Sequence, residues 1–173
     1  MTAAAGPWRG LLHAVHDGAG RIAVLMAGIG AAIVAVQTLW IAYGVVMRYV
    51  FKSPDRLATE ATALLLLPVA FVGLAYALRE DAIPKVTILA DLLQPRARRV
   101  LDLLNLAIMV AVGAFFSAAG VRAVAGTYLS GAASEILVWP KFAFWLPAAA
   151  GLLVFTAYAA LKAALLLADS ERE

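Results

Sequence analysis

The stretch IAVLMAGIGAAIVAVQTLWIAYGVVM, from Ile22 to Met47, contains no charged side chain. A helix needs about 20 largely apolar residues to cross the hydrocarbon core of a bilayer, which is about 30 Å thick. The stretch is long enough for that, and it is longer than the apolar core of a cleavable signal peptide, which has roughly 7–15 residues. We therefore predict a membrane-spanning helix over 22–47 that stays in the membrane as an anchor.

Three further stretches have the length and composition of spanning helices, at about 57–78, 103–121 and 142–168. Continuous apolar runs have no periodicity that separates strand from helix, but their length and their richness in alanine and leucine favour helix. The sequence therefore predicts an all-α integral membrane protein, in which residues 1–173 form one domain with four transmembrane helices.

The composition of the whole chain agrees with this prediction. Of its 173 residues, 64% are hydrophobic and 14% are charged, whereas soluble domains have about 45–50% and 25%. The chain contains no cysteine, which excludes disulfides, thiolate metal sites and a cysteine nucleophile. The net charge of +3 is better explained by loops that face an anionic membrane surface than by nucleic-acid binding. We expect membrane lipid, and no nucleic acid, among the partners.

Lysine and arginine are unequally divided between the two sides of the predicted bundle. One side holds Arg9, Arg21, Arg79, Lys85, Arg96, Arg98, Arg99, Lys162 and Arg172, and the other holds Arg48, Lys52, Arg56, Arg122 and Lys141. Cytoplasmic loops are enriched in these residues. We therefore predict that both termini are cytoplasmic.

Two shorter segments have the pattern of amphipathic helices that lie on the membrane surface. In residues 8–17, apolar side chains recur at positions i, i+3, i+4 and i+7. Residues 85–94 carry a similar stripe and are bracketed by prolines that suit a helix start and stop. A loop that covers helix ends explains the second segment equally well.

Glu60 is the one acid well inside a predicted span, where ionisable groups are costly and commonly functional. Arg48 ends the first predicted helix on the same side of the membrane, and a short turn makes the first two helices neighbours, so the two side chains can meet. Glu60 is then either a proton or cation site, or a contact that fixes two helices or a partner subunit. We favour the second interpretation, because a proton relay normally needs several titratable groups along its path.

Small residues form two smooth faces on the predicted helices. They are Ala27, Gly28, Ala31, Ala32 and Ala35 on the first helix, and Gly113, Ser117 and Gly120 on the third. Such spacing lets helices approach closely in lipid. Packing within the four-helix unit and docking onto a larger partner both explain these faces.

No group of residues in the sequence fits an enzyme active site. Haem between helices needs histidines within the spans, and the chain's two histidines, His13 and His16, lie in the N-terminal segment. We therefore expect no catalytic residue, no metal and no cofactor. So few polar residues in the spans also argue against a pore or a substrate site, and favour a supporting subunit of a larger assembly.

Five segments in their order and spacing resemble the small membrane subunit, of the DctQ type, of tripartite ATP-independent periplasmic (TRAP) transporters. They are Val46–Phe51 around Arg48, Glu60, Phe71–Glu80, Arg96–Asp102, and Trp139-Pro140 followed by Pro147. The resemblance runs over nearly the whole chain. The residues it singles out as fixing helices or contacting a subunit are Arg48, Glu60, Arg79, Trp139 and Pro140.

The resemblance implies a division of labour in the bacterial inner membrane. A periplasmic binding protein captures a small organic acid, a large elevator-type subunit carries it across the membrane driven by a sodium gradient, and the small subunit is a membrane scaffold. Candidates to touch the binding protein are Lys52, Arg56, Arg122 and Lys141. The alternative is a self-sufficient small proton-coupled exporter that acts as an oligomer, with Glu60 as the coupling site.

Overall fold

The computed structural model describes residues 7–53, 56–83 and 94–170. These residues form five helices: α1 (Pro7–Tyr49), α2 (Arg56–Val72), α3 (Leu74–Arg79), α5 (Pro95–Leu129) and α6 (Phe142–Ser170). The described part contains no strand, only an isolated antiparallel bridge between Ala133 and Pro140.

Four stretches are long and apolar enough to cross a membrane: Ala14–Tyr49, Leu57–Arg79, Ala97–Leu129 and Phe142–Ala168. The prediction of an all-α protein with four membrane-spanning helices is confirmed. The second stretch comprises α2 and α3 together.

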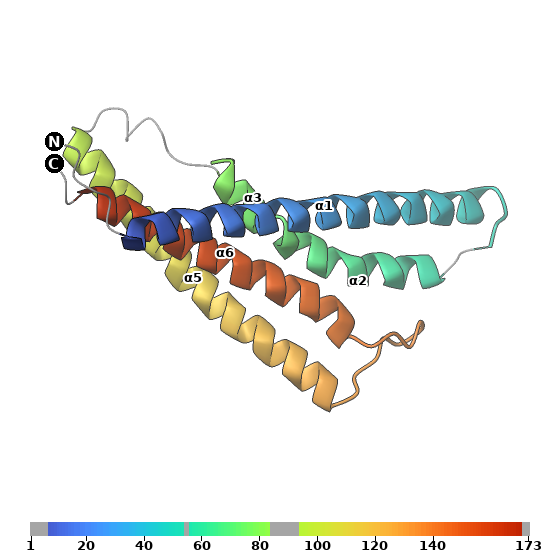
Figure 1. The fold of residues 1–173 in the computed structure, drawn as a ribbon. Coiled ribbons are helices and arrows are strands. Elements are labelled where there is room, and N and C mark those ends of the chain that lie inside the picture. Colours follow the sequence, from blue (N-terminus) through green and yellow to red (C-terminus); the bar gives the residue numbers. More distant parts are fainter. Residues whose placement is uncertain (1–6, 54–55, 84–93, 171–173) are drawn as a thin grey trace.

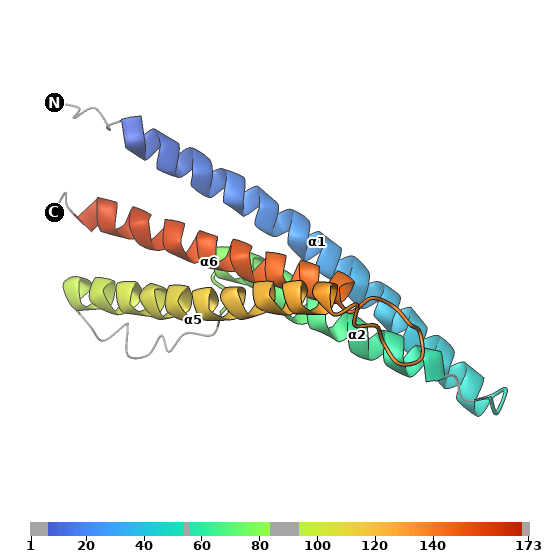
Figure 2. The same cartoon turned by 90° about the horizontal axis from the view of Figure 1, so that it is seen from below.

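The four spans alternate in direction, so the start of α1 and the end of α6 lie at the same end of the bundle (Figures 1 and 2). We call this the termini end. The turn between α1 and α2 and the connection between α5 and α6 lie at the opposite end, which we call the loop end. This arrangement agrees with termini on one side of the membrane, whereas their cytoplasmic location stays a prediction.

Helix α1 is much longer than a bilayer requires. Its 43 residues extend about 65 Å at 1.5 Å per residue, roughly twice the thickness of the hydrocarbon core. The structure differs here from the expectation of a separate helix over 8–17, because these residues form the first turns of α1 without a break. Gly18 and Gly20 follow the segment, and a glycine inside a helix costs only about 1 kcal/mol relative to alanine, which is too little to interrupt it. The second expected surface segment, 85–94, falls almost entirely outside the described residues.

The second span is broken at Gly73, which separates α2 from α3. Pro68 lies within α2 and removes one backbone donor from the helix. Helix α6 passes very close to this break: a Cβ atom on Gly151 would lie 2.6 Å from the carbonyl oxygen of Phe71 and 2.9 Å from Cα of Val72. Glycine at 151 is therefore what allows the two backbones to touch.

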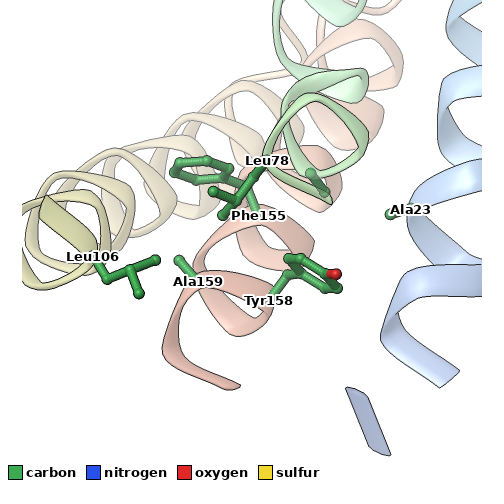
Figure 3. Close-up of a cluster of buried hydrophobic side chains, with 7 residues drawn as sticks. Ala23, Leu78, Leu106, Phe155, Tyr158 and Ala159 are labelled. Atoms are coloured by element: carbon green, nitrogen blue, oxygen red, sulfur yellow. The ribbon is translucent and has the colours of Figure 1, made fainter. Parts of the chain in front are cut away.

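Helix α6 occupies the centre of the bundle, because it packs against α1, α2, α3 and α5. A cluster of buried side chains gathers around it (Figure 3). Its members are Ala23 from α1, Ala75 and Leu78 from α3, Leu106 from α5, and Phe155, Tyr158 and Ala159 from α6.

The two small-residue faces have different surroundings. On α5, Gly113 and Gly120 are buried against α6, where their added Cβ atoms would meet Oγ1 of Thr156 at 2.5 Å and Cβ of Ala149 at 3.3 Å. Ser117 lies between them and shares a 3.1 Å hydrogen bond with Thr156. The face on α1 points outward instead: Gly28, for example, is exposed, and nothing lies within 4 Å of its added Cβ.

Candidate functional site

The α5–α6 loop (residues 130–141) is held against α2 by the carboxylate of Glu60. Oε1 accepts hydrogen bonds from the backbone N–H groups of Glu135, at 2.7 Å, and Ile136, at 3.2 Å. Oε2 accepts from Ile136, at 3.0 Å, and Leu137, at 2.8 Å. Three successive N–H groups thus converge on one carboxylate, in the manner of the backbone concavities that bind anions.

The loop also closes on itself. The backbone N–H of Ser134 donates to the carbonyl of Trp139 at 2.8 Å, and the N–H of Trp139 donates to the Ser134 hydroxyl at 3.1 Å. Between them, Val138 adopts a φ of 57°, which is unfavourable for a β-branched residue. The Glu60 contacts and the Ser134–Trp139 pair therefore hold a backbone conformation that valine would not adopt by itself.

Arg48 lies at the end of α1 and does not pair with Glu60. The Glu60 oxygens accept hydrogen bonds from the backbone of the α5–α6 loop instead. Among the described residues, which include both side chains, no ion pair joins Arg48 to Glu60. Arg48 is exposed and lines a cavity of about 370 Å³ between α1 and α2, together with Gly44, Thr59 and Thr62. The two helices are joined nearby by a 3.2 Å hydrogen bond from the Gln37 amide to the carbonyl of Thr62.

Arg79 joins α3 to α1 at the termini end. Its Nη1 donates to the carbonyl of Gly20 at 3.2 Å, and its Nε lies 3.9 Å from the carboxylate of the adjacent Glu80. An added Cβ on Gly20 would lie 3.5 Å from Nε of Arg79. The hydrogen bond therefore links α3 to α1, whereas a role of Arg79 in fixing the two helices stays a prediction.

The remaining residues singled out from the sequence lie at the loop end. Trp139 and Pro140 belong to the α5–α6 loop, where Pro140 forms the bridge with Ala133 and Trp139 stacks on Phe144 at a ring-centroid distance of 6.1 Å. The four candidates for contact with a binding protein lie in four different parts of the chain: Lys52 follows α1, Arg56 opens α2, Arg122 lies two turns before the end of α5, and Lys141 directly precedes α6.

The sequence interpretation missed a polar cluster between helices at the termini end. Lys162 of α6 donates to Asp81 at 2.8 Å and to the carbonyl of Leu78 at 3.3 Å. One turn earlier on α6, the hydroxyl of Tyr158 lies 3.1 Å from Nε2 of His16 on α1. In the sequence, Lys162 counts only as a positive charge on one side of the bundle, and His16 only as part of the N-terminal segment. The sequence did contain one signal: Tyr158 and Lys162 are four positions apart, a spacing that places these two side chains on one face of a helix.

Several polar side chains within the spans bond to each other or to the helix backbone. Ser117 pairs with Thr156, and Thr38 donates to the carbonyl of Val34 at 2.8 Å. Thr62 and Thr127 bond in the same way to carbonyls one turn before them. In the described ranges, no three His, Cys, Asp or Glu side chains form a group that could hold a metal ion.

A family model described as "Tripartite ATP-independent periplasmic transporters, DctQ component" matches residues 37–168. The match covers well over half of the chain, from the middle of α1 to the last turns of α6, and it includes Arg48, Glu60 and Arg79. A search of curated proteins found no match.

Proposed function

Because the chain belongs to the DctQ family of TRAP transporter components, we propose that this small permease subunit is the membrane scaffold for a large elevator-type subunit. In this proposal the complex takes up a small organic acid, driven by a sodium gradient and delivered by a periplasmic binding protein. The scaffold lies in the bacterial inner membrane with both termini in the cytoplasm.

The observation that best supports the scaffold role is that the Glu60 carboxylate is hydrogen-bonded to the α5–α6 loop. Its two carboxylate oxygens accept four hydrogen bonds from the α5–α6 loop, so the acid within the second span serves to join two parts of the fold. A proton-coupled exporter would need this carboxyl to exchange protons and to change partners during transport. The contacts of Glu60 give that alternative no support.

The outward face of α1 supports a contact with the large subunit. Gly28, Ala31 and Ala35 are exposed along one side of the helix, and small residues let helices approach closely in lipid. The corresponding stripe on α5 is already used against α6, which leaves the α1 face as the one available for a helix of the large subunit.

The basic residues of the loop end support a contact with the binding protein. Arg48, Lys52 and Arg122 are exposed there, beside a loop whose shape is held by Glu60. If the termini are cytoplasmic, the loop end faces the periplasm, where the binding protein delivers its substrate.

The test combines purification with transport. The tagged subunit should co-purify from its native membranes with a large multi-span TRAP subunit, identified by mass spectrometry. Proteoliposomes that contain this subunit alone should show no sodium-driven uptake of radiolabelled organic acids, whereas the complete complex with its binding protein should. Sodium-dependent uptake by the subunit alone would overturn the scaffold role.

A further inference from the structure

A small polar cavity of about 210 Å³ opens between α1, α3 and α6 at the termini end. It is lined by His16, Asp17, Gly20, Arg21, Arg79 and Tyr158. Five of these six residues carry a polar or charged side chain, although the surrounding helices are dominated by alanine and leucine. This composition sets the cavity apart from the apolar helix faces around it.

The walls of the cavity are held in place by contacts between the three helices. Arg79 is tied to α1 by the hydrogen bond from its Nη1 to the carbonyl of Gly20, 3.2 Å long. Tyr158 is 4% exposed, its hydroxyl lies 3.1 Å from Nε2 of His16, and the two rings are 4.7 Å apart between centroids. A ligand would therefore meet side chains that are already positioned, which reduces the entropy lost on binding.

The charges that line the cavity favour an anion. Arg21 and Arg79 contribute two positive charges and Asp17 one negative charge, so the arginines outnumber the acids in the lining. Glu80 lies beside Arg79, 3.9 Å from its Nε, but is not part of the lining. A phosphodiester carries a single negative charge, and the planar guanidinium group matches the spacing of phosphate oxygens.

The position of the cavity along the helices corresponds to the level of the lipid headgroups. Arg79 is the last residue of the span Leu57–Arg79. Arg21 lies within the longer span Ala14–Tyr49, but it directly precedes the uncharged stretch that begins at Ile22 and follows Gly20, whose carbonyl accepts from Arg79. Both guanidinium groups therefore lie where the hydrocarbon core ends, and basic pockets between helices at this depth are suited to lipid headgroups. We propose that the cavity between α1, α3 and α6 binds the phosphate group of a membrane phospholipid.

The proposal concerns lipid binding by this chain alone and does not depend on its role in transport. Free phosphate offers the same chemistry, so the experiment must separate the two sources. Native mass spectrometry of the full-length protein in detergent can titrate phosphatidylglycerol, phosphatidylcholine and inorganic phosphate one by one. Both lipids carry the phosphodiester and are expected to bind, whereas inorganic phosphate at the same concentration should not displace them.

Arg21→Gln is the main variant, because Arg21 is exposed and its loss leaves the helix packing in place. It should weaken phosphatidylglycerol binding about tenfold or more, the effect of losing one charged hydrogen-bond donor. Arg122→Gln is the matched control: it removes an exposed arginine at the loop end and should leave the affinity unchanged. Tyr158→Phe removes only the hydroxyl and should weaken binding to a smaller extent.

Equal affinities of the wild type and Arg21→Gln would overturn the proposal. So would an equal loss in Arg21→Gln and Arg122→Gln, since that would indicate general attraction to basic residues. Displacement of lipid by inorganic phosphate would assign the cavity to the free anion instead. If neither lipid binds the wild type, the proposal fails and a carboxylate of a partner subunit becomes the better candidate for the cavity.

Discussion

Oε2 of Glu60 accepts a hydrogen bond from the backbone N–H of Leu137 at 2.8 Å, although the two residues are 77 positions apart in the sequence. The contact joins the start of the second span to the loop between the last two spans. The same carboxylate also accepts hydrogen bonds from the backbone N–H groups of Glu135 and Ile136. The Glu60 side chain therefore connects the α1–α2 pair to the α5–α6 pair at the loop end.

Glu60→Gln should loosen the α5–α6 loop. The variant loses the negative charge and replaces one acceptor oxygen with an NH₂ group, which cannot accept from a backbone N–H. We expect faster hydrogen exchange at the amides of residues 135–137, with little change in the amides of α5 and α6. The matched control is Glu135→Gln, which removes a carboxylate from the same loop but leaves its backbone N–H in place. Unchanged exchange in Glu60→Gln would contradict the role assigned to this contact.

Gly151→Ala should destabilise the bundle. The added Cβ would lie 2.6 Å from the carbonyl oxygen of Phe71, a backbone atom that cannot move aside without shifting α2 away from α6. Overpacking of this kind typically lowers the free energy of unfolding by about 1–3 kcal/mol. The midpoint of thermal unfolding, measured in detergent, should therefore fall.

Gly126→Ala is the control for this substitution. Gly126 lies in α5, and nothing is found within 4 Å of its added Cβ. Since alanine favours helix by about 1 kcal/mol over glycine, its midpoint should stay the same or rise slightly. Equal midpoints for the two variants would show that the close approach at Gly151 is relaxed at no cost.

Gly28→Leu should weaken assembly with a large subunit without unfolding this one. Gly28 is exposed on α1, and its added Cβ meets nothing within 4 Å, so a larger side chain fits the isolated chain. In a close helix–helix contact it would hold the partner away. The measurement is the yield of co-purified large subunit relative to wild type, with the thermal midpoint of the isolated subunit as the check on folding. Full co-purification would place the interface elsewhere.

Single cysteines should report which end of the bundle faces the cytoplasm, because the natural chain contains none. Ser130→Cys lies at the loop end and Gly10→Cys at the termini end, and both positions are exposed. With cytoplasmic termini, a membrane-impermeant maleimide added to cells with a permeabilised outer membrane should label only Ser130→Cys. Labelling of both after lysis is the control, and the reverse pattern in intact cells would invert the topology.

The number and approximate positions of the spans were predictable from the sequence. The transfer of a side chain into lipid depends mainly on that side chain and its neighbours in the chain, so an uncharged stretch such as Ile22–Met47 is sufficient to indicate a span. The sequence also singled out Glu60, because an acid within an apolar stretch is unusual wherever it then points.

The partner of Glu60 was not predictable. Arg48 was the predicted partner because it ends the neighbouring helix on the same side of the membrane, but the carboxylate instead accepts from three backbone N–H groups in a loop more than 70 residues away. Backbone donors carry no signature in the sequence, since every residue except proline has one. Their convergence depends on the course of the loop, including the positive φ of Val138.

Local hydrophobicity by itself therefore determined that this is a membrane protein with four spans and one unusual acid. Only the tertiary structure decided which small-residue face is buried, which stays open, and what Glu60 and His16 contact. The physical reason is that insertion into lipid is a sum over neighbouring residues, whereas these contacts join residues that only helix packing brings together. The contact between Tyr158 and His16, 142 positions apart, depends entirely on the central place of α6 between α1 and α5.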